Sequence, residues 1–465
     1  MKKLLRTLAG VLAVSLLASF AGCSKEKTQT PDSQSNDTVS NPEAVETTES
    51  NASASGDPDT IYWLADYDLN PAANSERSTA LSLFEEQYHG KIVWVPCNAD
   101  ECYDVLVQRR NSGEPVDMLP FQTNAMPDGI SRELFSPLDE YLDLNDSVWD
   151  GMRNAIDMFA YDGKHYVVPY SVSDPLLLTY SRKLCQENGL EDPYSLYSQD
   201  KWDWDAMFDL MLQFKSQNSE HYGIAGWFEQ GLLHSTGQSV ISFDGTQFQN
   251  NIMDEEIGQA EELLSDLAAR GLYDKTWYNN YPTSGNVLFY AMGDWSLPAS
   301  NAKNPDADIM VVPFPKSPRV SDQFYCGNYD AKMLAYDSDK GALVASYILC
   351  ERNAAAKDEY RASAKEKALA KTTNILGETT GFVTGEQYDV IDDYKLHSKP
   401  IYEFGLGMGG VTMYTHGMYT YETRGVMNNI LDGLLTYPDT GDTWENLRDS
   451  LSPLIDQELG EYNLQ

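Results

Sequence analysis

The feature that most constrains the fold is a repeated alternation of strand-like and helix-like segments that begins at residue 60. Segments 60–64, 91–96 and 116–119 are short and largely apolar, which favours buried strands. Segment 75–89 places apolar residues on one helical face and stops at Gly90. Because alternation of this kind places helices over parallel strands, the sequence predicts an α/β fold.

A second series of alternating segments follows residue 163. The chain from residue 59 onward is longer than one hydrophobic core usually serves, so we expect two lobes. The final hundred residues are mostly helical in pattern. The second series predicts strands at 165–169, 176–180 and 309–313, and helices at 203–215, 254–270 and 341–351.

The first 23 residues have the pattern of an export signal. A basic start is followed by an apolar run over 8–20, which is too short to span a bilayer comfortably. Small residues then lead to Cys23, and this ending resembles the lipobox of bacterial lipoproteins, in which the cysteine carries the lipid. An ordinary cleaved signal with an incidental Cys23 is the alternative. We predict a signal peptide at 1–22, and a lipid anchor with a disordered polar tether at 23–58, which places the protein outside the cytoplasm at the cell membrane.

Charge and cysteine content exclude several classes of function. The net charge is −38, from 71 acidic and 33 basic residues, which argues against nucleic acid because phosphate contacts need clustered Lys and Arg. The cysteines after Cys23 and the six histidines lack metal-ligand spacing, so we expect no metal and no cofactor. Cys97 and Cys102 either form a local disulfide or are buried thiols.

Several short motifs occur in a fixed order and spacing. They are Glu-Pro-Val-Asp-Met at 114–118, Leu-Phe-Ser-Pro-Leu-Asp at 134–139, Tyr-Asp-Gly-Lys-His-Tyr-Val-Val-Pro-Tyr at 161–170, Leu-Thr-Tyr-Ser-Arg-Lys at 178–183, Asn-Gly-Leu at 188–190, Lys-Trp-Asp-Trp-Asp at 201–205 and Ala-Met-Gly-Asp-Trp at 291–295. Together they resemble the sugar-type extracellular solute-binding proteins of ABC importers, the maltose-binding-protein-like family. Ser181 stands where this family usually has Asn, and from residue 320 onward the resemblance is only general.

The resemblance implies a two-lobe periplasmic-binding-protein-like fold of type II, with hinge crossings and a ligand cleft between the lobes. Lobe 1 would comprise 59–172 plus 327–375, and lobe 2 would comprise 173–326 plus 376–465. The resemblance also implies a monomer that binds a sugar, an oligosaccharide in our interpretation. The monomer passes this sugar to the permease subunits of an ABC importer without catalysis.

Candidate ligand residues follow from the chemistry of a sugar, which offers apolar ring faces and hydroxyl groups. Aromatic side chains bind the faces, and fixed polar groups bind the hydroxyls. In α/β lobes such residues follow strands, and Asp66 and Phe121 stand at such positions. The resemblance implies that Asp66 is a hydroxyl acceptor and that Phe121 is an aromatic platform. The resemblance adds Asp174 and, more weakly, Tyr170. A turn role for each Asp, or a core role for Phe121, is the structural alternative.

Four further candidates come from later in the chain. Trp295, in Met-Gly-Asp-Trp, stands where the family has a stacking Trp, and Trp227 after Gly226 is a second candidate platform. Tyr421 and Arg424 are three residues apart and would share one helical face, either toward ligand or toward solvent.

Two other functions remain open from the sequence. A secreted glycoside hydrolase needs two carboxylates flanking the scissile bond, and the many acidic residues would permit such a pair. No GxSxG or HExxH motif points to another hydrolase. A binding protein for a different solute, such as a polyamine or a peptide, is the second alternative.

Overall fold

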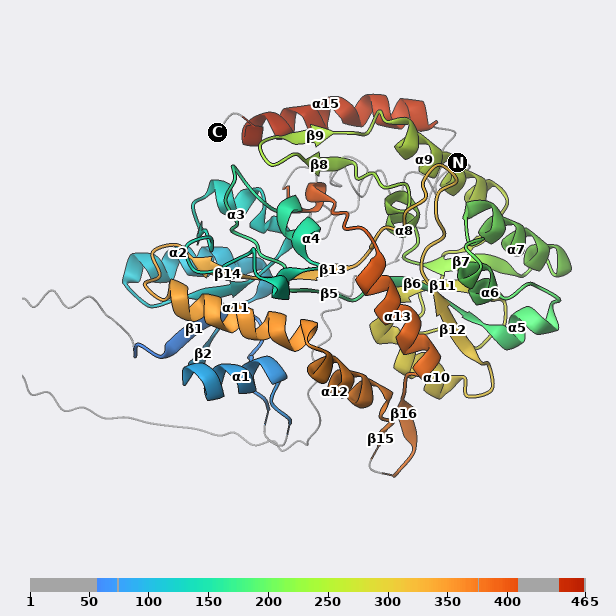
Figure 1. Cartoon of the computed structure of the whole chain (residues 1–465). Helices are drawn as coiled ribbons and strands as arrows, with labels where there is room; N and C mark the ends of the chain where they lie inside the picture. The colour runs from blue at the N-terminus through green and yellow to red at the C-terminus, as the bar shows by residue number, and fades with distance from the viewer. Residues whose placement is uncertain (1–56, 73–74, 375, 409–442, 464–465) are drawn as a thin grey trace, which may run out of the picture.

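The structure is a computed structural model that describes residues 57–72, 75–374, 376–408 and 443–463. Two five-stranded sheets, each flanked by helices, lie in separate halves of the molecule (Figure 1). The predicted α/β class is therefore confirmed.

The first sheet has the strand order β2-β1-β3-β14-β4. Strand β1 runs parallel to β2 and β3, whereas β14 runs antiparallel to β3 and β4. Helices α1 and α11 pack against each other beside this sheet (Figure 1). The elements of this half are β1 (Thr60–Ala65), α1 (Thr79–Tyr88), β2 (Lys91–Pro96), α2 (Cys102–Ser112), β3 (Met118–Pro120), α3 (Asp128–Ser131), β4 (Phe135–Ser136), α4 (Arg153–Met158), β14 (Lys332–Ala335) and α11 (Gly341–Ala356).

The second sheet has the strand order β10-β7-β11-β6-β12. Strands β10, β7 and β11 run parallel, so their carboxyl ends lie at one edge. All seven residues of the central strand β11 are buried, because helices cover both faces of the sheet. The elements of this half are β6 (Leu176–Ser181), α5 (Arg182–Glu187), α6 (Pro193–Ser198), α7 (Trp204–Gln217), β7 (Tyr222–Gly226), α8 (Glu229–His234), α9 (Glu255–Ala269), β10 (Tyr273–Asp274), β11 (Val287–Gly293), α10 (Leu297–Lys303) and β12 (Ile309–Val312).

Helix α7 illustrates how the sequence specifies an element of this half. The Asp203 side chain accepts a hydrogen bond from the Ala206 N–H at 2.9 Å and caps the first turn. Buried residues then recur at helical spacing, so that one face packs on strand β7.

Two expectations about secondary structure were wrong. The first helix begins at Thr79 rather than at residue 75, because the Ser78 side chain caps it by accepting from the Leu81 N–H at 3.1 Å. Residues 165–169 form no strand, because their hydrogen bonds go elsewhere: the His165 N–H donates to the Asp139 carboxylate, and its carbonyl accepts from Leu138. The strand of this region is the later, shorter β5 (Ser171–Ser173).

Strands β5 and β13 (Asn328–Asp330) form an antiparallel pair between the two sheets (Figure 1). Each of them links a strand or helix of one half to a strand of the other. The Asp330 carboxylate accepts hydrogen bonds from the hydroxyls of Ser171 at 2.7 Å and Ser173 at 2.6 Å. The two crossings are therefore fastened to each other by side chains as well as by backbone.

A hairpin and the last helix lie together along one side of the molecule (Figure 1). The hairpin is β8 (Ile241–Phe243) with β9 (Phe248–Asn250), and the helix is α15 (Trp444–Asn463). The Asn463 side chain donates to the Phe248 carbonyl and accepts from the Phe248 N–H, both at 2.9 Å. At the tip of the hairpin, the Gly245 carbonyl accepts a hydrogen bond from the Asp162 N–H.

The remaining elements are short or lie outside the two sheets. Cys97 and Cys102 form a disulfide, with their Cα atoms 5.4 Å apart. No helix in the described part of the chain has the length and apolar character needed to cross a membrane. The other elements are η1 (Ala99–Glu101), η2 (Thr123–Ala125), η3 (Ser147–Trp149), η4 (Asp294–Ser296), α12 (Asp358–Leu369), β15 (Thr372–Thr373), β16 (Thr379–Gly381), α13 (Gly385–His397) and η5 (Phe404–Gly407).

Candidate functional site

Three exposed indole rings follow three adjacent parallel strands of the second sheet. Trp227 follows β7, Trp277 follows β10 and Trp295 follows β11. Their exposed fractions are 51%, 44% and 50%, although tryptophan is usually largely buried. We refer to these three residues as the tryptophan cluster.

The rings of the tryptophan cluster contact one another. The Trp227 centroid lies 5.0 Å from that of Trp277, with 42° between the ring planes, and 6.4 Å from that of Trp295, with 60° between the planes. Because the planes are tilted, the rings form a curved aromatic surface at the carboxyl edge of the sheet. Ligands of open α/β sheets bind at this edge.

Two glycines allow the backbone to bring these rings together. Gly226 has φ of +91°, and a Cβ there would lie 2.2 Å from the Ala291 carbonyl oxygen. This close approach lets the Trp227 N–H donate to the same carbonyl at 2.9 Å. A Cβ at Gly293 would lie 2.4 Å from the Trp295 indole nitrogen, so glycine also makes room for that ring.

Polar side chains lie directly beside Trp295. Asp294 forms an ion pair with Lys395 of α13 at 3.3 Å, and its N–H donates to the Pro175 carbonyl. Asp174 precedes that proline and accepts a bond from the Asn328 amide at 3.0 Å. Burial raises the pKa of the Asp294 carboxyl, and the charge of Asp174 adds to this rise, while Lys395 opposes it. The Asp174 charge is therefore close enough to act on the Asp294 carboxyl.

The first half contributes a different surface around the end of β1. Asp66 is exposed, and Tyr67 is 45% exposed. The Tyr67 ring is partly exposed, but burial of its hydroxyl raises the pKa of Tyr67. The charges of Glu351, Asp66 and Asp330 raise this pKa further. Since Asp330 belongs to crossing strand β13, the Asp66 region lies near the crossings.

An exposed indole also borders this end of β1. The Trp94 indole N–H donates to the Ala65 carbonyl at 2.9 Å, and the ring remains exposed. Neither Trp94 nor Tyr67 was among the residues singled out from the sequence.

Two predicted residues are packed into the protein. Phe121 is partly buried, with its ring centroid 5.3 Å from Phe159 and 5.9 Å from Tyr402. Tyr170 is buried, and its hydroxyl accepts a hydrogen bond from the Lys332 ammonium. The structure therefore joins Trp227, Trp295 and Asp174 in one region, places Asp66 near the crossings and gives Phe121 and Tyr170 packing contacts.

Three further candidates, Cys23, Tyr421 and Arg424, lie outside the described residues. Sequence reasoning missed Trp277, because β10 has only two residues and gives no strand pattern. It also missed Asp294, although this residue stands inside the motif that pointed to Trp295. Lys395 gave no signal, because its link to the site depends on the packing of a distant helix.

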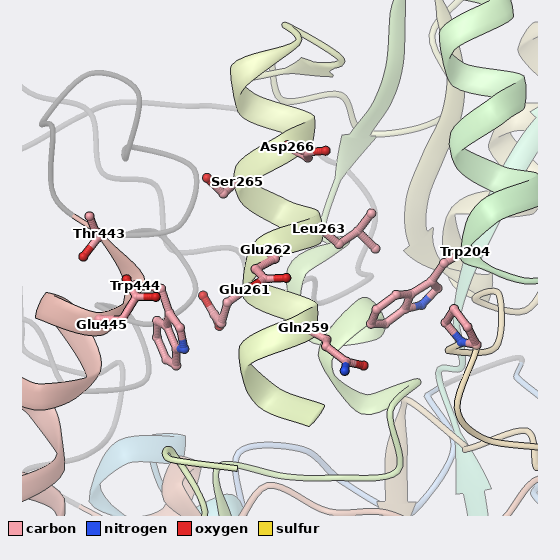
Figure 2. Close-up of a pocket in the computed structure, with 11 residues that line it drawn as sticks. Trp204, Gln259, Glu261, Glu262, Leu263, Ser265, Asp266, Thr443, Trp444 and Glu445 are labelled. Carbon is pink, nitrogen blue, oxygen red and sulfur yellow. The ribbon is translucent and has the colours of Figure 1, made fainter. Parts of the chain in front are cut away.

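A separate surface cavity of about 630 Å³ lies along α9, and its lining includes Trp204 of α7 as well as the start of α15 (Figure 2). It shares no residue with the tryptophan cluster. Figure 2 shows the side chains of Glu261 and Trp444 beside each other in this cavity. Both are buried, and within the described ranges neither the Glu261 oxygens nor the Trp444 indole nitrogen has a hydrogen-bond partner. Burial raises the pKa of Glu261 well above its usual range, which favours a neutral carboxyl group packed beneath α15.

The described residues contain no group of three or more His, Cys, Asp or Glu side chains that could hold a metal ion. The indoles of the tryptophan cluster offer ring stacking, and the neighbouring Asp174, Asn328 and Asp294 side chains offer hydrogen bonding.

These observations define a two-lobed α/β protein with an exposed aromatic surface at the carboxyl edge of one sheet. The chain belongs to the bacterial extracellular solute-binding protein family, whose model matches residues 79–340. The family membership predicted from the motifs is confirmed. A comparison with curated protein sequences gave no match.

Solved structures share the fold at low sequence identity. A cyclo/maltodextrin-binding protein complexed with maltotetraose has a TM-score of 0.56 and 15% identity, covering 87% of this chain and 98% of its own. The sugar-binding protein MalE from Xanthomonas citri has a TM-score of 0.61 and 14% identity, covering 86% and 98%. An extracellular solute-binding protein from Staphylococcus aureus in complex with maltose has a TM-score of 0.57 and 12% identity, covering 87% and 99%. These neighbours confirm the predicted two-lobe type II fold.

Proposed function

We propose that this protein captures a carbohydrate, in particular an oligosaccharide, between its two lobes and delivers it intact to the permease of an ABC importer. The observation that carries the proposal is the tryptophan cluster, in which three exposed indoles lie at the carboxyl ends of adjacent strands and the Trp227 ring contacts the other two.

Exposed indoles are suited to the apolar C–H faces of sugar rings. Exposure of this much aromatic surface is unfavourable in water, so a guest that covers the rings gains hydrophobic free energy. Asp174, Asn328 and Asp294 lie at the margin of the cluster and supply hydrogen-bonding groups for hydroxyls. A surface of several contacting rings is longer than one sugar ring needs, which favours an oligosaccharide. The similar structures whose names mention maltotetraose and maltose agree with this substrate class.

Capture would use the two crossings as a hinge. In this proposal lobe 1 comprises 59–172 plus 327–375, and lobe 2 comprises 173–326 plus 376–465. Closure would bring Asp66 and Tyr67 of lobe 1 toward the tryptophan cluster of lobe 2, with β5 and β13 at the base of the cleft. The lobes enclose the guest and leave its bonds intact.

The main experiment is titration calorimetry of the folded chain against maltotriose, cellotriose and xylotriose, with spermidine and a tripeptide as the competing classes. We expect heat of binding with at least one trisaccharide and none with spermidine or the tripeptide. Chromatography of the recovered sugar should return the trisaccharide unchanged. Binding of spermidine alone would contradict the carbohydrate class, and cleaved sugar would contradict the transport role.

We further propose that residues 1–22 direct export and that Cys23 carries a lipid that anchors the protein to the cell membrane. Cys23→Ala should move the protein from the membrane fraction to the medium and abolish incorporation of labelled palmitate. Ser24→Ala is the matched control and should leave both unchanged. Retention of the Cys23→Ala protein in the membrane fraction would exclude the lipid anchor.

A further inference from the structure

A short loop closed by a disulfide stands at the carboxyl edge of the first sheet. Cys97 directly follows strand β2, and Cys102 begins helix α2. We refer to residues 97–102 as the disulfide loop. Because strands β1, β2 and β3 run parallel, the loop lies at the same edge of the sheet as Asp66, which follows β1. The disulfide therefore belongs to the face of lobe 1 that the proposed capture turns toward the tryptophan cluster.

The disulfide loop lies well away from the crossings along this edge. Crossing strand β13 leads into β14, whose first residue Lys332 pairs with Pro120 at the end of β3. Strand β2 is three strands from β14 in the sheet order, which is about 14 Å at the usual strand spacing. Displacement in a hinge rotation grows with distance from the hinge, so the loop forms an outer lip of lobe 1 that moves far on closure.

Hydrogen bonds connect the disulfide loop to the ends of β1 and β3. The Cys97 N–H donates to the Ala65 carbonyl at 3.1 Å, and the Trp94 indole N–H donates to the same carbonyl at 2.9 Å. The Gln122 side chain, which follows β3, donates to the Ala99 carbonyl at 3.1 Å. The position of the loop is therefore coupled to the strand ends that carry the exposed side chains of lobe 1.

The disulfide is the strongest constraint on the start of helix α2. In the part of the chain that the structure describes, neither η1 nor α2 begins with a side-chain hydrogen bond to its first turn. The Asn98 amide donates to the Glu101 carboxylate at 2.8 Å, but both residues are exposed and water competes for this bond. Beyond the loop, Tyr103 is buried with its ring centroid 5.3 Å from that of Phe135. Loss of the disulfide should therefore free residues 97–101 and leave helix α2 in place.

We propose that Cys97 and Cys102 are positioning residues for ligand capture. Their disulfide holds the outer lip of lobe 1 in the shape that closes on the guest, and a dithiol reductant that opens the disulfide lowers the affinity. The inference rests on the proposed carbohydrate function and adds a redox control of the same site. Cys97 is partly exposed whereas Cys102 is buried, so an incoming thiolate reaches the Cys97 sulfur.

The opening step is a thiol–disulfide exchange with an external dithiol. The first thiolate of the dithiol bonds to the Cys97 sulfur and displaces the Cys102 thiolate, which takes up a proton. The second thiolate of the dithiol then attacks its own bonded sulfur and releases Cys97, which is also protonated. The protein gains two electrons and two protons, and the dithiol becomes a disulfide. An oxidising environment reverses the step and restores the lip.

The test is titration calorimetry of the oxidised protein and of the protein reduced with dithiothreitol, using the best-binding trisaccharide of the panel above. Reduction should weaken binding about tenfold, because a free lip that holds the bound shape in roughly one molecule in ten lowers the apparent affinity by that fraction. Reoxidation should restore the affinity. Mass spectrometry after alkylation checks that residues 97 and 102 carry thiols. Cys185, Cys326 and Cys350 are buried free thiols, so reduction leaves them unchanged.

Hydrogen exchange separates a local effect on the lip from unfolding of the lobe. The Cys97 N–H bonds to the Ala65 carbonyl and the Glu101 N–H bonds to the Asn98 carbonyl, so both amides should exchange at least about tenfold faster after reduction. Amides of β1, and of α2 beyond Tyr103, should keep their rates. Loss of protection across the whole first sheet would show that the disulfide holds the lobe together, and it would overturn the positioning role.

Variants locate the effect at the disulfide. The double variant Cys97→Ala, Cys102→Ala should bind with the affinity of the reduced protein and should not respond to dithiothreitol. Cys185→Ala, which removes a thiol of the second half, is the control and should keep both the affinity of the parent and its response.

The outcomes separate this inference from the proposed function. A double variant or a reduced parent that binds as tightly as the oxidised parent would overturn the inference and leave the carbohydrate function intact. Failure of dithiothreitol to reduce the folded protein would overturn the redox control. Absence of binding by the oxidised parent to every trisaccharide would overturn both the function and the inference.

Discussion

The two sheets present different side chains where their parallel strands end. The second sheet exposes three indoles in contact with one another, whereas the first sheet exposes Asp66, with the single rings of Tyr67 and Trp94 nearby. Phe121, which also follows a strand of the first sheet, packs against Phe159 and Tyr402. An aromatic residue after a strand is therefore left exposed, as a candidate binding surface, only where no later segment of the chain covers it.

This comparison predicts opposite effects for aromatic substitutions in the two halves. The packed aromatic rings of the first half, such as Phe121 and Phe159, should mainly stabilise the fold, whereas those of the tryptophan cluster should mainly bind ligand. The predictions below test this division, beginning with the largest effect.

Phe159→Ala should reduce the free energy of unfolding by about 3–5 kcal/mol. The Phe159 ring is fully buried and contacts Phe121, Tyr402, Phe404 and Tyr329, so its removal leaves a cavity among four rings. Urea unfolding measures the change, and Phe159→Leu, which retains most of the volume, should lose clearly less. A stable Phe159→Ala protein with weakened sugar binding would contradict the division.

Trp295→Ala should weaken binding of the best trisaccharide by about 2–3 kcal/mol, or roughly 30–150-fold, because the ring supplies most of one stacking face. Its stability should change by less than about 1 kcal/mol, since half of the ring is already in water. Tyr141→Ala removes a comparably exposed ring of the first half and serves as the control, with unchanged affinity expected. Unfolding of the Trp295→Ala protein would show that this indole belongs to the core.

The sequence predicted the second sheet's surface only in part, and the reason is physical. Trp227 directly follows Gly226 and Trp295 stands two residues after Gly293, which a sequence shows directly. Trp277 joins them only because the two-residue strand β10 pairs with β7, and such a pairing has no periodic signature.

The fold was more predictable than the site. Strands 60–64, 91–96 and 176–180 were predicted correctly, because short apolar segments between helical ones have few alternatives. The predicted strand at 165–169 failed, because its polar backbone groups bond to Leu138 and Asp139 instead of to a neighbouring strand. Exposure and packing depend on contacts between distant segments, which periodicity does not report.

The buried His234, close to Trp227 in the sequence, should make the stability of the second half depend on pH. It ends helix α8, which begins two residues after Trp227, and burial lowers its pKa from 6.5 to about 4. Because the unfolded state binds a proton at a higher pH than the folded state does, the His234 contribution to stability is present above pH 6.5. This contribution is lost as pH falls from 6.5 toward 4.

The expected size of this loss is about 2 kcal/mol at pH 5. His234→Leu removes the titrating group, so between pH 7 and pH 5 it should lose about 2 kcal/mol less stability than the parent protein does. Urea unfolding at both pH values measures the difference, and His397→Leu, at an exposed site, is the control. Equal losses in the parent and the His234→Leu protein would mean that His234 is accessible to protons in the folded state.

Trp277→Ala should have the smallest effect on sugar affinity, and it tests how far the proposed binding surface extends. The Trp277 ring contacts Trp227 at 5.0 Å, and its indole N–H donates to the Asn279 side chain, so it extends the cluster away from Trp295. We expect about 1 kcal/mol of lost affinity for a trisaccharide, roughly fivefold, and a smaller loss for the matching disaccharide, which would not reach the third ring. Trp277→Phe keeps an aromatic face and should restore most of the affinity. If the trisaccharide and the disaccharide lose affinity equally, Trp277 acts by holding Trp227 in place, and the platform that distinguishes the second sheet from the first consists of two rings.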